Sequence, residues 1–121
     1  MKVKINKVNS PGNLAKERVG FVALETVEIS NYAVMDHSFS NDGDLSDIGR
    51  HVYKFPKKVI PQGDKIVLYT KRGTNSAEQK EGYTVHFFYW NRAATVWNAN
   101  DRDTCILMEV HDTQVVKVNA D

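Results

Sequence analysis

Residues 83–107, YTVHFFYWNRAATVWNANDRDTCIL, hold both tryptophans and the only cysteine of the chain. The run Val85–Trp90 places aromatic side chains on both faces of a strand, which is typical of a strand inside a sandwich rather than at its edge. Thr95–Asn98 (TVWN) follows, and an Asn- and Asp-rich turn separates it from the apolar run Thr104–Val110. A small β domain buries much of its apolar area in such a block, at roughly 25 cal/mol per Å². The stretch predicts two or three strands at the centre of the fold.

Outward from this block, short apolar runs recur about every ten residues and are separated by turn-forming Gly, Pro, Asn and Asp. Glu25–Ser30 alternates, with Val27 and Ile29 on one face, so we expect a strand with one face on the core. Lys65–Thr70 (KIVLYT) is apolar on both faces and is predicted to be central. The pattern contains no convincing helix and therefore indicates an all-β sandwich of about seven to nine strands.

The remaining segments complete this prediction. We expect Asn31–Asp47 to be the least regular region and Val52–Phe55 to be a short strand stopped by Pro56. Lys71–Gly82 is polar and aperiodic, so it is predicted to be a surface loop. Gln114–Val118 is predicted to be the last strand.

Composition sets the broad class. A chain of 121 residues forms one domain, here predicted over residues 1–121. Sixteen Lys and Arg against fifteen Asp and Glu give a net charge of +1, and this balance supplies no electrostatic reason to expect nucleic acid or an anionic membrane as the main partner. One cysteine cannot form an internal disulfide. No signal peptide or membrane span is recognisable, so we expect a cytoplasmic protein.

Several short segments, in this order, resemble the lamin tail domain, an immunoglobulin-like β-sandwich. They are Glu25–Asn31 (ETVEISN), Leu45–Asp47 with Tyr53–Pro56 (LSD and YKFP), Ile60–Gly63 with Val67–Thr70 (IPQG and VLYT), Gly73–Asn75, Tyr89–Trp90, Val96–Asn98, and Asp103–Leu107. The resemblance covers residues from about 20 to 118 and implies the immunoglobulin-like fold. It does not carry over the filament role of nuclear lamins, because this chain has no heptad pattern.

The alternation and the aromatic block together predict which side chains form the core. These are Val27, Ile29, Phe55, Leu68, Tyr89, Trp90, Trp97 and Leu107. An alternative places Tyr89, Trp90 and Trp97 on an exposed surface that stacks against sugar rings or single-stranded bases. We favour core packing, because this block is also the part that resembles the family.

Few residues suggest chemistry. A D-x-D-x-x-D cluster is formed by Asp42, Asp44 and Asp47. We favour the interpretation that it is an exposed acidic turn; the alternative is that its carboxylates bind a calcium ion. The four histidines lie in separate segments without metal-ligand spacing. Cys105 lies in a strand without a base nearby in the sequence and is predicted to be a small core residue. We therefore predict no enzyme activity, no cofactor and no metal.

The leading functional hypothesis is a non-catalytic module that binds a protein partner or acts as a scaffold. The first alternative is a nucleic-acid-binding module, and the second is a calcium- or glycan-binding adhesion domain that uses the acidic cluster. The first alternative would use a basic face formed by Lys54, Lys57, Lys58, Lys65, Lys71 and Arg72. The oligomeric state is left open.

Overall fold

The computed structural model describes residues 1–39, 45–97 and 103–119. These residues form ten strands and one short 3₁₀ helix: β1 (Val3–Asn9), β2 (Arg18–Ala23), β3 (Val27–Glu28), η1 (Ile29–Asn31), β4 (Tyr32–Phe39), β5 (Leu45–Lys54), β6 (Val59–Ile60), β7 (Lys65–Tyr69), β8 (Ser76–Gln79), β9 (Thr84–Tyr89) and β10 (Asp103–Glu109).

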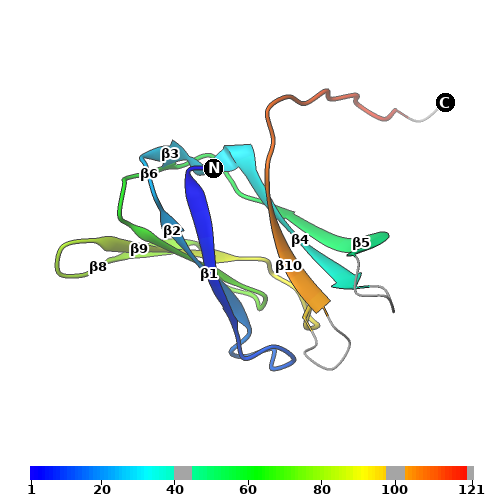
Figure 1. Ribbon diagram of the computed structural model, residues 1–121, viewed down its shortest axis with the longest axis horizontal. Coiled ribbons are helices and arrows are strands. Elements are labelled where there is room, and N and C mark those ends of the chain that lie inside the picture. Colours follow the sequence, from blue (N-terminus) through cyan, green and yellow to red (C-terminus); the bar gives the residue numbers. More distant parts are fainter. Residues whose placement is uncertain (40–44, 98–102, 120–121) are drawn as a thin grey trace.

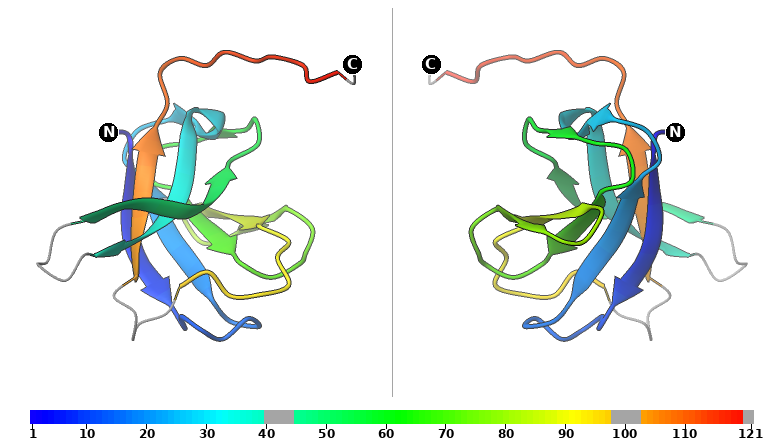
Figure 2. Two further views of the ribbon diagram at one scale, coloured as in Figure 1. Left: turned by 90° about the vertical axis from the view of Figure 1, so that its right-hand side faces the viewer. Right: turned by 90° about the vertical axis from the view of Figure 1, so that its left-hand side faces the viewer.

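The strands form three sheets. The largest has the order β1-β2-β7-β9-β8, the second has the order β10-β4-β5, and β3 pairs only with β6. Strands β7 and β9 are parallel, and the other pairs are antiparallel. Figures 1 and 2 show the three-stranded sheet on one side of β1 and β2, with the β8–β9 hairpin extending away from it. The arrangement is a β-sandwich, as the sequence predicts.

The core lies between the two larger sheets and is centred on Phe55. The Phe55 ring meets the rings of Phe21 and Phe88 edge to face, at centroid distances of 5.8 and 5.1 Å. Such contacts add to the stabilisation from burial alone. Five side chains predicted for the core are buried in it: Val27, Ile29, Phe55, Leu68 and Trp97. Trp90 and Leu107 are partly buried and pack against this cluster.

The prediction for Tyr89 is wrong, because strand geometry turns its side chain outward. Successive side chains of a strand point to opposite faces. In β9, Phe88 is fully buried and Phe87 and Tyr89 are only partly buried. Strand β9 lies between β7 and β8, which confirms the prediction of an inner strand with aromatic residues on both faces.

Two predictions of irregular structure are also wrong. Lys71–Gly82 contains β8, which pairs with β9, and every residue of β8 is exposed, so neither face carried a periodic apolar signal. Asn31–Asp47 contains β4 and the start of β5. The alternation in β4 was hidden because Asp36, a polar residue, follows Tyr32 and Val34 on the buried face.

The alternation predicted for Glu25–Ser30 produces the expected burial of Val27 and Ile29, but only two residues are in a strand. The chain then turns into η1. The Glu28 carboxylate promotes this turn, because its Oε2 atom accepts hydrogen bonds from the N–H groups of Ser30 (3.2 Å) and Lys58 (2.8 Å).

The expected last strand, Gln114–Val118, is not a strand in the structure. The Val110 N–H donates to the Asn31 carbonyl (2.7 Å), and the chain beyond it runs away from both sheets (Figures 1 and 2). Val115, Val116 and Val118 are 84–92% exposed. A strand forms only where its backbone groups have a partner, and alternation alone does not supply one.

Candidate functional site

The predicted basic face is divided by the five-stranded sheet. Lys54, Lys57 and Lys58 lie at and after the end of β5, and the Lys58 ammonium lies 5.8 Å from the centroid of Phe88, whose ring points into the core. Lys65 points to the opposite face, because it precedes the buried Ile66 in β7. The six cations therefore do not form one continuous surface.

The outward face of the five-stranded sheet carries a ladder of three aromatic rings, Tyr69, Phe87 and Tyr89. The Tyr69 ring stacks on Tyr89 with a centroid distance of 5.4 Å and an interplanar angle of 10°. It also stacks on Phe87 at 6.4 Å and 28°. The parallel register explains the ladder, since Tyr69 lies directly opposite Tyr89 and Phe87 is two residues back on the same face. All three side chains are partly exposed.

Two cations on this face of the sheet lie over aromatic rings, one of which belongs to the ladder. The Lys65 ammonium lies 4.9 Å from the centroid of Tyr83, and the Lys71 ammonium lies 4.8 Å from the centroid of Tyr69. Arg18, at the start of β2, lies opposite Tyr69 in the sheet register. Cation–π attraction keeps Lys71 close to the ring face of Tyr69.

The loop after β7 crosses the ring of Tyr89. Gly73 N–H donates to Asn91 Oδ1 (2.9 Å), and Tyr89 N–H donates to Asn75 Oδ1 (3.0 Å). These bonds press the Gly73 backbone against the Tyr89 ring so closely that a Cβ atom on Gly73 would overlap three ring atoms. A side chain at position 73 therefore has no room.

Gly73→Ala is expected to destabilise the protein by about 1–3 kcal/mol, the usual cost of overpacking, and to displace the Tyr89 ring. Denaturant unfolding measures the first effect, and the NMR chemical shifts of the Tyr89 ring measure the second. Gly20→Ala is the matched control, because Gly20 lies in β2 of the same sheet and a Cβ there would only reach ordinary contact with the Lys7 carbonyl, at 3.9 Å. Equal stability of Gly73→Ala and wild type would show that the loop containing Gly73 does not pack tightly against the Tyr89 ring.

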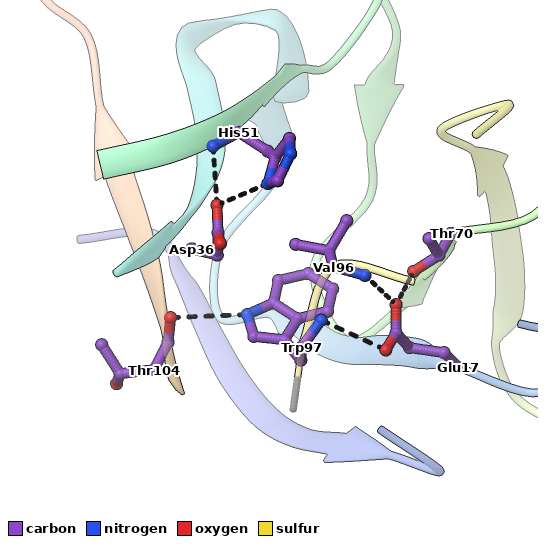
Figure 3. A network of polar contacts seen from close by, with 7 residues as sticks. All are labelled: Glu17, Asp36, His51, Thr70, Val96, Trp97 and Thr104. Carbon is purple, nitrogen blue, oxygen red and sulfur yellow. Dashed lines mark hydrogen bonds and ion pairs between the residues drawn. The ribbon is translucent and has the colours of Figure 1, made fainter. Parts of the chain in front are cut away.

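A buried carboxylate, Glu17, anchors the segment that follows β9 (Figure 3). Its Oε2 accepts hydrogen bonds from Thr70 Oγ1 (2.5 Å) and Val96 N–H (2.9 Å). Its Oε1 accepts hydrogen bonds from Gly12 N–H (2.9 Å) and Trp97 N–H (3.2 Å). Both carboxylate oxygens accept two hydrogen bonds each. Glu17 therefore connects the turn before β2, the end of β7 and the segment after β9. Nothing in the sequence pattern pointed to Glu17.

A second acidic residue, Asp36, lies beside Cys105. Asp36 Oδ1 accepts a hydrogen bond from His51 N–H (2.6 Å) and lies 3.2 Å from His51 Nδ1 (Figure 3). Cys105 is opposite Asp36 in the register of β4 and β10. Burial, with the negative charge of Asp36, raises the pKa of the Cys105 thiol to about 12. A thiol that stays protonated at neutral pH is a poor nucleophile.

A third buried pair, Asp64 and His86, connects the turn before β7 to β9. Asp64 Oδ2 lies 2.9 Å from His86 Nε2, and Asp64 Oδ1 accepts the Thr84 N–H at 3.0 Å. Burial alone would raise the pKa of Asp64, but the bonds from His86 and Thr84 and the charges of His86 and Lys58 outweigh it. The pKa is therefore lowered from its ordinary value of 3.8.

This shift predicts a loss of stability in acid. Because the pKa of Asp64 is lower in the folded protein, its stabilising effect is fully present above the unfolded-state pKa of about 4, and it is lost as the pH falls through the folded-state value. Asp64→Asn should flatten the fall of the unfolding free energy below about pH 4, as measured by denaturant unfolding at several pH values. Glu81→Gln, at an exposed turn residue, is the control. An unchanged acid slope in Asp64→Asn would contradict the prediction.

Metal ligands do not gather in the part of the chain that the structure describes, which holds no group of three or more His, Cys, Asp or Glu residues able to bind one ion. Asp42 and Asp44 lie outside the described residues, and so does the side chain of Asp47, so neither the favoured acidic turn nor the calcium alternative is tested. No helix among the described residues is long and apolar enough to cross a membrane.

The aromatic ladder differs from the surface that the sequence suggests. The alternative of an exposed aromatic surface includes Tyr89 with Trp90 and Trp97, and it contains neither Tyr69 nor Phe87. A signal is present in part: Lys65, Val67 and Tyr69 alternate with the buried residues of β7, and the second half of β9 alternates about the buried Phe88. What the pattern could not supply is the parallel register that brings the three rings together.

Two packed sheets around an aromatic core define the class of this protein as an immunoglobulin-like β-sandwich domain. The family model of the lamin tail domain matches residues 1–120. The chain belongs to the lamin tail domain family. A search of curated proteins found no match to it.

Proposed function

We propose that this lamin tail domain is a non-catalytic protein-binding module and that the aromatic ladder of Tyr69, Phe87 and Tyr89 is the centre of its binding surface. The observation that carries this proposal is the placement of three partly exposed aromatic rings side by side on the outward face of the largest sheet. Tyr and Phe are enriched at the centres of protein interfaces, where they contribute large apolar areas.

The way the rings are packed favours a protein partner over nucleic acid or glycan. Bases and sugar rings stack on open aromatic faces. Here Tyr69 stacks on both neighbouring rings, Lys71 lies over Tyr69, and Gly73 lies against Tyr89. The ring faces of Tyr69 and Tyr89 are therefore partly covered, and their edges and hydroxyls suit apolar and hydrogen-bonding side chains. The division of the basic residues between two faces also weakens a continuous phosphate track.

The buried polar groups support a non-catalytic role. The Glu17 carboxylate is occupied by four hydrogen-bond donors, and the Asp64 carboxylate is bonded to His86 and to Thr84 N–H. The raised pKa of Cys105 keeps its thiol protonated. A nucleophile needs an activating base and access to substrate, and these arrangements provide structural connections instead.

Site-specific photocrosslinking tests the proposal. A benzophenone amino acid in place of Phe87 should crosslink a protein partner in an extract of the native source. The control is the same group in place of Val52, which is 57% exposed on the three-stranded sheet. Equal crosslinking from both positions, or crosslinked material that nuclease removes, would contradict a protein-binding surface at the ladder.

A further inference from the structure

A hollow of about 570 Å³ lies next to the aromatic ladder and gathers three cations. The cations are Lys71, Arg72 and Arg92. The rest of the lining is apolar and consists of Leu14, Ala15 and Ala93. Lys71 also lies over Tyr69, so the hollow adjoins the ladder. Leu14 and Ala15 come from the turn before β2, and the other residues follow β7 and β9.

Two of the three cations lie against aromatic rings, Lys71 over Tyr69 and Arg92 near Trp90. The Arg92 guanidinium lies 5.9 Å from the Trp90 ring centroid, and Arg92 N–H donates to the Thr70 carbonyl (3.0 Å). The ion pairs found within the described ranges involve other residues and none of Lys71, Arg72 and Arg92. The Glu17 carboxylate nearby accepts hydrogen bonds from Thr70 and from the backbone of Val96 and Trp97 and pairs with none of these cations, so a net positive charge remains at the hollow and attracts an anion.

The Arg92 side chain lacks a hydrogen-bond acceptor for one of its N–H groups within the described part of the chain. Its Nε atom is buried and has no hydrogen-bond partner among the residues that the structure describes. A buried donor without a partner costs free energy, so the Arg92 side chain gains stability if it turns Nε toward an acceptor. A guanidinium that presents two N–H groups in this way binds a carboxylate through two parallel hydrogen bonds.

We propose that this hollow binds a carboxylate side chain of an acidic peptide segment in the protein partner. This inference rests on the proposed function and names the chemistry of the partner. The apolar lining from Leu14, Ala15 and Ala93 suits the methylene groups of a glutamate and an adjacent apolar residue. A phosphate backbone would gain little from that lining, and the partly covered ring faces of Tyr69 and Tyr89 offer its bases little stacking surface.

The test uses a blocked hexapeptide of alternating glutamate and leucine as the probe, titrated into the full chain at low salt. Saturable binding should weaken by about tenfold or more in Arg72→Glu, which brings a like charge to the hollow. Lys57→Glu makes the same charge change at an exposed residue beyond β5 and should alter the affinity by less than about twofold. The Arg92 Nε–H signal should shift in ¹H–¹⁵N spectra as the peptide binds.

Several results would overturn the inference. These are equal binding of a glutamine–leucine peptide, equal weakening by Lys57→Glu, an unmoved Arg92 Nε–H signal, or tighter binding of a six-residue oligothymidylate. Different results would contradict the protein-binding surface at the aromatic ladder and the acidic-peptide site in the hollow. Crosslinking from position 87 without peptide binding would remove only the acidic-peptide site, and peptide binding at Arg72 without crosslinking would remove the ladder as the binding surface.

Discussion

Trp97→Ala is expected to lower the free energy of unfolding by about 3–5 kcal/mol, the usual cost of removing a large buried aromatic side chain. Trp97 is only 3% exposed, and its ring meets the Trp90 ring at a centroid distance of 5.9 Å and an angle of 64°. Its indole N–H donates to the Thr104 carbonyl (3.4 Å), which connects the segment after β9 to β10. The substitution removes the packing and this connection together.

A loss of this size is a large part of the total stability of a small domain, about 5–15 kcal/mol. Denaturant unfolding of wild type and variant measures it directly. Trp97→Phe is the matched comparison, because it keeps an aromatic ring and loses the indole N–H, so its loss should be smaller. A Trp97→Ala protein within about 0.5 kcal/mol of wild type would mean that Trp97 behaves as a surface residue.

Glu17→Ala is the second substitution with a large expected effect, a loss of at least about 3 kcal/mol. It would leave the N–H groups of Gly12, Val96 and Trp97, and the Thr70 hydroxyl, without their acceptor. Each unsatisfied buried donor costs about 1–3 kcal/mol, and water entering the space recovers part of this.

A graded series separates the hydrogen bonds of Glu17 from its packing. Thr70→Val removes one donor, so it should cost about 1–3 kcal/mol. Glu17→Gln keeps the side-chain volume and replaces one acceptor by a donor, so its effect should lie between those of Thr70→Val and Glu17→Ala. The series is measured by denaturant unfolding. Glu17→Gln as stable as wild type would show that shape, and not the four hydrogen bonds, holds the segment.

Both substitutions act on the same short segment after β9. Trp97 anchors it to β10, and Glu17 anchors it to the turn before β2 and to the end of β7. Arg92 lies at the start of this segment and lines the cationic hollow. The position of the proposed carboxylate site is therefore determined by these buried connections.

The sequence by itself determined the class of fold and most of the core. Alternating apolar residues, turn-forming residues and the aromatic block predicted a sandwich, and Val27, Ile29, Phe55, Leu68 and Trp97 are buried as expected. These predictions hold because side-chain period and hydrophobic burial are local properties that each strand expresses in its own residues.

Only the tertiary structure decided the surface. Tyr69, Phe87 and Tyr89 form a ladder because β7 and β9 pair in parallel and in one register, and that pairing is not encoded in either strand alone. Strand β8 forms because it pairs with the edge of β9. The segment Gln114–Val118 has the sequence pattern of a strand, but it pairs with no other segment in the described structure and is not a strand. Backbone hydrogen bonds and contacts between distant residues depend on which segments meet, and the folded chain settles this as a whole.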